Sequence, residues 1–297
     1  MYMENICTKS GKPLSLVGLG TFPFQGEEMA NIMEQAISLG YNVIDTADDY
    51  RGETGIGIAV KRGSFKREDV FLQTKISNNT AYTDEPLAGK FFNRYSEVIR
   101  RHSVDEIVRE KVETSLREMH TDYLDSVLIH YPYQDYYEVI WKTLMDLKNE
   151  GVIRHIGVSN FHVRHIERLK KDGLEIPAIN EIYISPIGTK EEDVKYAEEN
   201  NIQLMTYSPL MDIAIHKIPE DHFMGLIHKY GKSLAQIILR WNVDRGCIPL
   251  AKSKKSKRLA DNINVVDFSL EKEEIEYISS LNINNQILPE SKICPGV

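Results

Sequence analysis

The chain has 297 residues, of which 42% are hydrophobic, so it can bury a large core. Asp and Glu (44) outnumber Lys and Arg (36), and the net charge of -8 argues against nucleic-acid binding, which needs a basic face. The three cysteines, Cys7, Cys247 and Cys294, show neither a disulfide framework nor zinc-ligand spacing. The first residues lack the apolar segment of a secretory signal, and no apolar run approaches the roughly 18 residues of a membrane span. We therefore expect a soluble cytoplasmic protein that does not act at a membrane.

Short runs rich in β-branched residues alternate along the chain with longer amphipathic segments. The runs predict strands at Leu16–Gly20, Asn42–Asp45, Val70–Lys75, Asp125–His130, Ile153–Ser159, Ile179–Ile184, Gln203–Ser208 and Cys247–Leu250. The amphipathic segments predict helices at Glu27–Leu39, Gly55–Arg62, Ser103–Met119, Tyr136–Asn149, Val163–Lys171, Glu191–Asn200, Ser233–Asn242 and Ser256–Asn262. Ser103 and Glu106 have the spacing of a capping box, which makes the third helix especially clear.

Eight strand–helix alternations without a break in composition predict one (β/α)8 barrel domain, a TIM barrel, over residues 1–297. The alternative is an open doubly wound sheet, which needs a phosphate-binding glycine turn after its first strand. Gly18-Leu19-Gly20 is followed by neither a third glycine nor an immediate helix, and Gly55-Ile56-Gly57 lies at a predicted helix start. Both signals are weak, so the barrel is favoured.

The connection between the third strand and the next helix, Ile76 to His102, is 27 residues long. Long connections in compact domains are commonly lids or binding loops, and here the loop would cover the face where barrel enzymes build their sites. Phe91 and Phe92 favour a substrate wall over the alternative of a solvated insertion.

Four polar residues follow predicted strand ends: Asp45, Tyr50, Lys75 and His130. The carboxyl ends of parallel strands meet at one end of a barrel, so these residues are expected to converge. A nearby ammonium lowers the pKa of a phenol, and a buried ammonium needs a carboxylate partner. With an imidazole to orient the substrate, the set suits protonation of a carbonyl oxygen. Taken singly, these residues have other interpretations. Tyr50 fits a boundary aromatic, Lys75 and Asp45 fit a structural ion pair, and His130 fits a core histidine.

The segment Gly40-Tyr-Asn-Val-Ile-Asp45-Thr-Ala-Asp-Asp-Tyr50-Arg-Gly-Glu53 resembles the signature of the aldo-keto reductase family. Later motifs follow in the family's order: Thr74-Lys75, Leu128 to Pro132, Gly157 to Phe161, Thr206 to Leu210, and Lys252-Ser253 with Arg258 and Asn262. The resemblance extends from about Leu16 to Phe268, nearly the whole chain.

This resemblance implies a barrel without a Rossmann domain, NADPH/NADP+ as cofactor, and reversible reduction of small aldehydes or ketones. By this resemblance, Tyr50 is the general acid, Lys75 and Asp45 adjust the pKa of Tyr50, and His130 orients the carbonyl. The family's steroid double-bond reductases have glutamate at the His130 position, so the histidine points to carbonyl reduction. The resemblance to this family also favours a monomer.

The resemblance also assigns cofactor contacts. Tyr207 would stack on the nicotinamide, Ser159 and Asn160 would hold its carboxamide, and Gly20, Thr21 and Ser208 to Leu210 would line the pyrophosphate. An ordinary strand-to-helix cap is the alternative for Ser159-Asn160.

Residues Lys252 to Arg258 carry five positive charges in seven positions. Such a run is often only a solvated segment. At this family position, Lys252, Ser253, Lys254 and Arg258 would bind an adenosine 2'-phosphate, and Asn262 would contact the adenine. Ser256 is expected to cap a helix whose N-terminus favours anions. These features favour NADPH over NADH.

The chain departs from the family pattern in two places. Glu181 stands where the family normally has a glutamine that helps to hold the nicotinamide carboxamide. The negative charge of Glu181 would favour the oxidised, cationic nicotinamide ring. The alternative is that the glutamate is a tolerated polar substitution. Phe22, Ser77 and Tyr131 stand where tryptophans are common, so the pocket beside Tyr50 and His130 is expected to be roomier and partly polar. That pocket suits a bulky or hydroxylated carbonyl.

No metal site is expected, because His162 and His165 share a helical face without an evident third ligand. Two competing functions stay open. One is a non-catalytic NADPH-binding regulatory or scaffold protein, against which the intact catalytic set argues. The other is a barrel lyase or hydrolase that uses Asp45 and His130 without nicotinamide.

Overall fold

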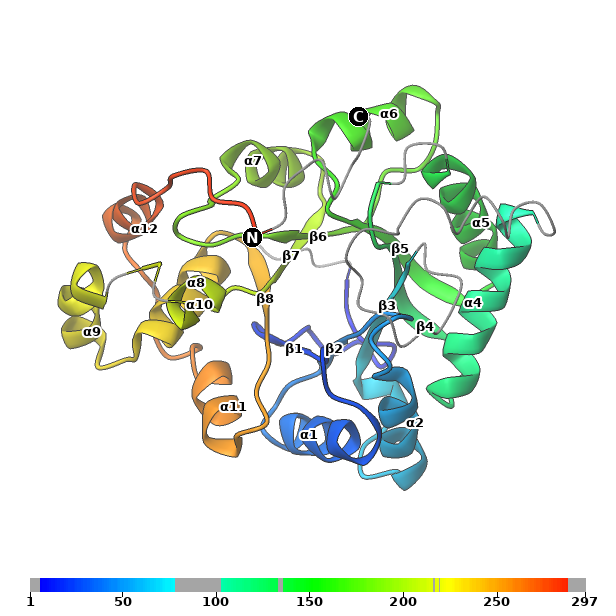
Figure 1. Cartoon of the computed structure of the whole chain (residues 1–297), viewed down its shortest axis with the longest axis horizontal. Coiled ribbons are helices and arrows are strands. Elements are labelled where there is room, and N and C mark those ends of the chain that lie inside the picture. The colour runs from blue at the N-terminus through cyan, green and yellow to red at the C-terminus, as the bar shows by residue number, and fades with distance from the viewer. Residues whose placement is uncertain (1–5, 78–102, 133–135, 216, 219, 288–297) are drawn as a thin grey trace.

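The computed structural model of the protein describes residues 6–77, 103–132, 136–215, 217–218 and 220–287. Eight strands, all parallel to their neighbours, close into a barrel in chain order (Figure 1). They are β1 (Gly18–Gly20), β2 (Val43–Asp45), β3 (Phe71–Ile76), β4 (Leu124–Ile129), β5 (Ile153–Ser159), β6 (Ile179–Tyr183), β7 (Gln203–Tyr207) and β8 (Cys247–Ala251). The predicted barrel and all eight predicted strands are confirmed, and the open doubly wound sheet is excluded.

Helices surround the strands as an outer layer (Figure 1). The eight predicted helices are present as α1 (Gly26–Ser38), α2 (Glu53–Arg62), α4 (Val104–Glu118), α5 (Tyr137–Asn149), α6 (Val163–Lys171), α7 (Glu191–Glu199), α10 (Leu234–Asp244) and α11 (Ser256–Ile263). The capping box of α4 is confirmed, since the backbone N–H of Ser103 donates to Oε2 of Glu106 over 3.0 Å.

The helices that lie outside the strand–helix repeat were not predicted from the sequence. These are α8 (Met211–Ala214), α9 (Met224–Tyr230), α12 (Lys272–Ser279) and the 3-10 helices η1 (Arg67–Asp69) and η2 (Glu220–Phe223). Helix α12 begins with a capping box made by Glu271 and Glu274. This pair lacks the Ser or Thr that identifies the motif in a sequence. Trp241 of α10 donates from Nε1 to Oγ of Ser279 over 3.2 Å and so ties α12 to the barrel.

Alternate residues of each strand point into the barrel, as the two-residue period of a strand requires. The inward residues of the lower layers form a separate apolar cluster that includes Val43, Phe71, Leu128, Ile179, Met205 and Ile248. Gly157 of β5 faces the same layer, where a Cβ atom would lie only 2.4 Å from Leu128. The interior is therefore a packed core up to the level at which the polar residues begin.

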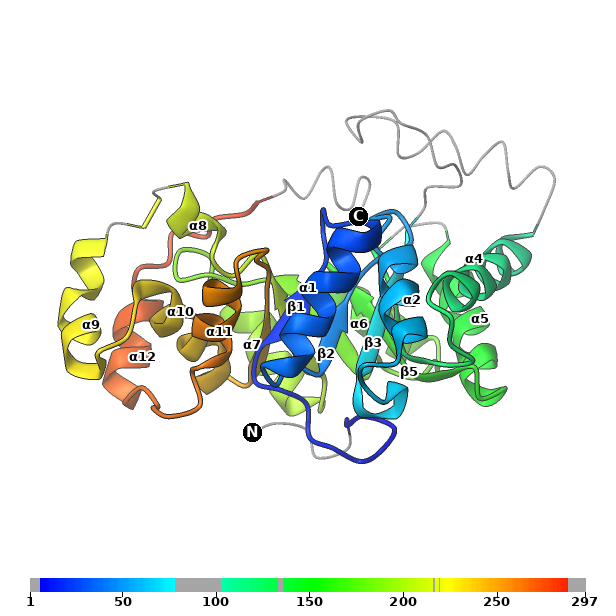
Figure 2. The same ribbon diagram turned by 90° about the horizontal axis from the view of Figure 1, so that it is seen from below.

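The segment before β1 closes the end of the barrel at which the strands begin. Cys7 and Pro13 form an antiparallel bridge. Arg154, at the start of β5, donates from Nη1 to the carbonyl of Cys7 over 2.9 Å. In the side view of Figure 2 this segment lies at the lower edge and α8 at the upper edge. None of the described helices combines the length and apolar character that crossing a membrane requires.

Candidate active site

The period of the strands places the predicted catalytic residues on the inner wall of the barrel. Asp45 lies two residues beyond Val43 of the apolar layer, Lys75 four beyond Phe71, and His130 two beyond Leu128. The register sets Asp45 beside Gln73, and Lys75 beside Leu128. Polar side chains from three adjacent strands therefore meet one layer above the apolar core, as the sequence predicted.

Lys75 is fully buried and forms an ion pair with Asp45, whose two carboxylate oxygens lie 2.6 and 2.7 Å from its Nζ. Nζ also donates to the carbonyl of Thr46 over 3.0 Å and lies 3.1 Å from Oε2 of Glu181. Burial alone would lower the pKa of Lys75, but the charges of Asp45 and Glu181 outweigh it and raise the pKa. Lys75 thus stays an ammonium.

Gln73 is a member of this cluster that the sequence analysis missed. Its Nε2 donates to Oδ1 of Asp45 over 2.9 Å and to Oε2 of Glu181 over 3.1 Å. Burial, followed by the charge of Asp45, raises the pKa of Glu181 well above its usual value, although Lys75 acts in the opposite direction. The signal in the sequence that could have found it is its position two residues before Lys75, on the same face of the predicted strand.

Tyr50 lies above this pair, with Nζ of Lys75 5.3 Å from the centre of its ring. Burial raises the pKa of Tyr50 well above 10, whereas Lys75 acts to lower it. Lys75 thus acts in the expected direction, but desolvation of the phenolate outweighs the nearby ammonium, and the net pKa of Tyr50 is raised. Tyr50 consequently holds its proton in the folded protein.

His130 faces Tyr50, with 3.4 Å between Nε2 and the phenolic oxygen. Burial and then the charges of Lys75 and Lys111 lower the pKa of His130 well below 6.5, so the imidazole is neutral. The ring stacks on Tyr131 at 4.5 Å between centroids.

The residues predicted to bind nicotinamide form one hydrogen-bonded chain. The Tyr207 hydroxyl donates to Oδ1 of Asn160 over 2.8 Å, and Nδ2 of Asn160 donates to the His130 carbonyl over 3.0 Å. Ser159 Oγ accepts from the same amide and donates to the Glu181 carbonyl over 3.0 Å. Asn160 has a positive φ of 63°, a conformation that asparagine tolerates better than most residues. This chain links β5, β6 and β7 beside the catalytic residues.

The predicted pyrophosphate contacts come from the ends of β1 and β7. Thr21 follows β1 and is buried, and its Oγ1 has no hydrogen-bond partner among the described residues. Gly20 ends β1, while Ser208 and Leu210 follow β7, with Ser208 exposed and Leu210 half-buried. An unsatisfied hydroxyl at this position fits a ligand that offers acceptor oxygens.

The basic segment lies at the end of β8 and the start of α11. Lys252, Lys254 and Arg258 are exposed there, whereas Ser253 and Asn262 are buried. The expectation that Ser256 caps this helix is wrong, because α11 begins at Ser256 itself and its hydroxyl accepts from Nε2 of Gln35 over 2.7 Å.

Phe22 lies between Tyr50 and the basic segment that begins at Lys252. Its ring, which is 50% exposed, lies 5.2 Å from the ring of Tyr50, and Nζ of Lys252 lies 5.4 Å from it. Ser77 is buried, and its backbone N–H donates to Oδ1 of Asp48 over 3.1 Å. The aromatic wall predicted from Phe91 and Phe92 lies outside the described residues, as does most of the 76–102 connection.

Two carboxylates next to Tyr50 were also missed by the sequence analysis. Oδ2 of Asp48 pairs with Nζ of Lys111 at 2.5 Å, and Oδ1 of Asp49 lies 3.8 Å from Nδ1 of His130. Both lie within the segment that resembles the family signature, which drew attention to Tyr50 alone.

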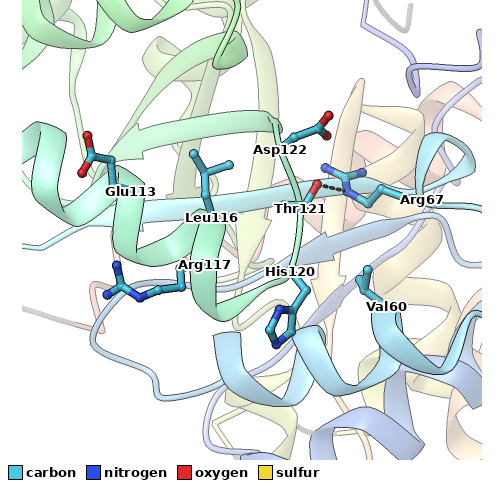
Figure 3. Close-up of a pocket in the computed structure, with 8 residues that line it drawn as sticks. All are labelled: Val60, Arg67, Glu113, Leu116, Arg117, His120, Thr121 and Asp122. Carbon is cyan, nitrogen blue, oxygen red and sulfur yellow. Dashed lines mark hydrogen bonds between the residues drawn. The ribbon is translucent and has the colours of Figure 1, made fainter.

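A separate open hollow of about 780 Å³ lies outside the barrel, between α2 and α4 (Figure 3). None of the predicted site residues lines it; its walls are Val60, Arg67, Glu113, Leu116, Arg117, His120, Thr121 and Asp122. In this hollow, Nε of Arg67 donates a hydrogen bond to Oγ1 of Thr121 over 3.0 Å. The described residues contain no cluster of three or more His, Cys, Asp or Glu side chains that could hold a metal ion.

Comparisons with known proteins show the family of this chain. The model of the aldo/keto reductase family matches residues 16–217 and 220–283. Glyoxal reductase of Bacillus subtilis (strain 168) is 34% identical over 287 residues, covering 96% of this chain and 95% of that protein. Methylglyoxal reductase DkgA of Escherichia coli (strain K12) is 31% identical over 284 residues, covering 95% and 94%.

Among solved structures, the aldo-keto reductase AKR2E4 of Bombyx mori in complex with NADP superposes with a TM-score of 0.81. It is 29% identical in sequence, and the match covers 97% of this chain and 95% of that one. With a family match over nearly the whole chain and relatives named as reductases, the chain belongs to the aldo/keto reductase family, oxidoreductases that act on carbonyl groups.

Proposed function

We propose that this protein reduces an aldehyde or ketone reversibly to the alcohol, with NADPH as the reductant and Tyr50 as the general acid. One observation carries the proposal. A phenol that holds its proton and a neutral imidazole lie 3.4 Å apart, directly above a buried lysine–carboxylate pair. Both can donate a hydrogen bond to one carbonyl oxygen.

The chain's own residues divide the work. Tyr50 and His130 donate hydrogen bonds to the carbonyl oxygen, and Tyr50 transfers its proton as negative charge develops there. Burial makes the resulting phenolate costly, and the ammonium of Lys75 at 5.3 Å from the ring offsets part of that cost. Asp45 keeps Lys75 charged and in position. NADPH, when bound, supplies the hydride.

The residues present fit NADP. Tyr207 would stack on the nicotinamide, and Ser159 and Asn160 would hold its carboxamide. The free hydroxyl of Thr21 would donate to the pyrophosphate. Lys252, Ser253, Lys254 and Arg258 would bind the 2'-phosphate, with Asn262 against the adenine. The Bombyx mori relative that binds NADP supports this choice.

The relatives named glyoxal and methylglyoxal reductase suggest small dicarbonyl aldehydes as first substrates to test. The pocket residues Phe22, Ser77 and Tyr131 support a wider choice, which includes bulky or hydroxylated carbonyls. We also propose that residues 1–297 act as one domain, and that the protein works as a cytoplasmic monomer, as the family prior favours.

The test is NADPH consumption against glyoxal, methylglyoxal, sugars, simple ketones and polycyclic ketones. Turnover of at least one of these compounds supports the proposal, and the compounds that are turned over identify the substrate class. Tight NADPH binding without any turnover would instead favour a regulatory or scaffold role. If NADPH fluorescence did not change on mixing, the nicotinamide assignment itself would be wrong.

A further inference from the structure

Two buried polar atoms face each other on the side of His130 that is turned away from Tyr50. Nδ1 of His130 and Oδ1 of Asp49 lie 3.8 Å apart, and the side chains are only 6% and 11% exposed. Neither atom has a hydrogen-bond partner in the part of the chain that the structure describes. Unpartnered buried polar atoms are uncommon, and a facing pair at a reaction centre requires an explanation.

The imidazole is placed between this carboxyl group and the proton donor. Its Nε2 faces the Tyr50 hydroxyl at 3.4 Å, and its Nδ1 faces Asp49. A neutral imidazole carries one N–H, and the hydrogen bond made by one nitrogen determines whether the other nitrogen bears it. The group at Nδ1 therefore controls what Nε2 offers to a substrate.

Building on the proposed function, we propose that Asp49 is a positioning residue for the reduction. Its carboxyl group holds the His130 ring at Nδ1 and thereby decides whether Nε2 presents a proton to the carbonyl oxygen. The two atoms need to approach by roughly 1 Å to reach hydrogen-bond distance.

The proton balance is simple. While Asp49 and Nδ1 share one proton, Nε2 keeps its own proton, whichever of the two partners holds the shared one. When the shared proton leaves to solvent, the remaining ring proton sits on Nδ1 and is donated to the Asp49 carboxylate. Nε2 is then a lone pair that accepts from Tyr50 instead of donating to the substrate. Reduction therefore needs the protonated pair.

The charged groups around Asp49 determine the pH at which this proton is lost. Burial, followed by the charge of Asp48, raises the pKa of Asp49 to about 7, while Lys111 and Lys75 act to lower it. These groups come from the same loop, from α4 and from β3, and Tyr131 adjoins from the end of β4. The pair loses its proton as pH rises through about 7, so reduction is expected to fall above that pH.

Asp49→Asn tests the proposal, because an amide donates to Nδ1 at every pH. For the wild type, kcat/KM should fall by about tenfold per pH unit above the midpoint near 7, as loss of one proton requires. For D49N the profile should stay flat from about pH 6 to about pH 8.5. Asp49→Leu, which fills the space without a hydrogen bond, should be about tenfold less active than D49N at every pH. The proposal is overturned if D49N keeps the wild-type midpoint.

Asp48→Asn is the matched control. This neighbour contacts Lys111 and the Ser77 backbone rather than the imidazole. Its charge helps to raise the pKa of Asp49, so D48N should shift the midpoint to lower pH without abolishing it. A flat profile in D48N would mean that Asp49 is not the titrating group.

Nitrogen NMR of the His130 ring tests the same point without catalysis. In wild type the proton should move from Nε2 to Nδ1 as pH rises through about 7, and in D49N it should stay on Nε2. The same tautomer in both proteins at all pH values would overturn the proposal, even for an active enzyme. If the protein turned over no carbonyl, this measurement would still judge Asp49, so failure of the proposed function is recognised separately.

Discussion

The hydroxyl oxygen of Tyr50 lies 3.4 Å from Nε2 of His130, and the two rings meet edge to face with their centroids 5.7 Å apart. This relationship places two donors where a single carbonyl oxygen can accept from both. Because burial raises the pKa of Tyr50 and lowers that of His130, both groups are uncharged before the reaction begins. In the proposed reaction, charge therefore develops only as the carbonyl oxygen takes up negative charge, so the two donors would stabilise the transition state more than the bound substrate.

Replacing Tyr50 by phenylalanine removes the proposed proton donor and keeps the ring. We expect kcat to fall by roughly 10²–10⁴-fold, the usual contribution of a general acid, while NADPH affinity stays near that of wild type. Steady-state NADPH consumption and fluorescence titration measure the two quantities. Tyr277→Phe is the control, since this tyrosine is exposed and its hydroxyl donates to the His222 carbonyl, away from the site. Substantial activity in Tyr50→Phe would exclude Tyr50 as the acid.

Removing the charge of Arg258 should weaken NADPH binding more than NADH binding. A charge-assisted contact contributes about 1.5–3 kcal/mol, so Arg258→Ala should raise the Kd for NADPH by roughly tenfold or more. The Kd for NADH, which lacks the 2'-phosphate, should change little. Lys257→Ala is the matched control, because Lys257 is exposed in the same basic run but is not assigned a contact. Equal losses for both cofactors would indicate that Arg258 does not bind the 2'-phosphate.

Glu181→Gln should change the ratio of the affinities for NADP+ and NADPH in a pH-dependent way. Burial raises the pKa of Glu181, so at low pH the wild-type side chain is neutral and resembles glutamine. As pH rises it ionises, and its charge favours the cationic oxidised ring. The two proteins should therefore differ most at the alkaline end of the accessible range, as measured by titration with each cofactor. Equal ratios at every pH would show that Glu181 is only a tolerated substitution.

Glu53 is expected to make the protein less stable as pH rises. Burial raises its pKa from 4.5 to about 7, and one of its oxygens accepts from Thr74 over 2.7 Å. Between those two values the folded state keeps a proton that the unfolded chain has released. Stability therefore falls through that window and levels off above about 7, by roughly 3 kcal/mol for a shift of this size.

Glu53→Gln should remove that part of the pH dependence, which urea unfolding near pH 5 and pH 8 would measure. Glu198→Gln, at an exposed position, is the control and should leave the dependence intact. If Glu53→Gln and wild type lost the same stability between these pH values, the carboxyl group would not be the source.

Much of the site could be predicted because the proposed catalytic residues lie at or just beyond strand ends. A run such as Val127-Leu128-Ile129 identifies a strand, and His130 then has to lie at its carboxyl end. The alternation along β3 likewise puts Lys75 on the same face as Phe71. Gln73 shares that face but escaped prediction, since its partners Asp45 and Glu181 come from strands 28 and 108 positions away.

The sequence by itself determined the barrel, its eight strands and the four polar residues, Asp45, Tyr50, Lys75 and His130, that meet above the apolar layer. These follow from local periodicity and from motifs, which need no knowledge of distant contacts. Only the tertiary structure decided the protonation states. Lys75 acts to lower the pKa of Tyr50, as expected, but burial raises it by more, and burial depends on everything that packs around the phenol. The same holds for Asp49, whose pKa and whose proximity to His130 exist only once β2, β3, β4 and α4 are brought together.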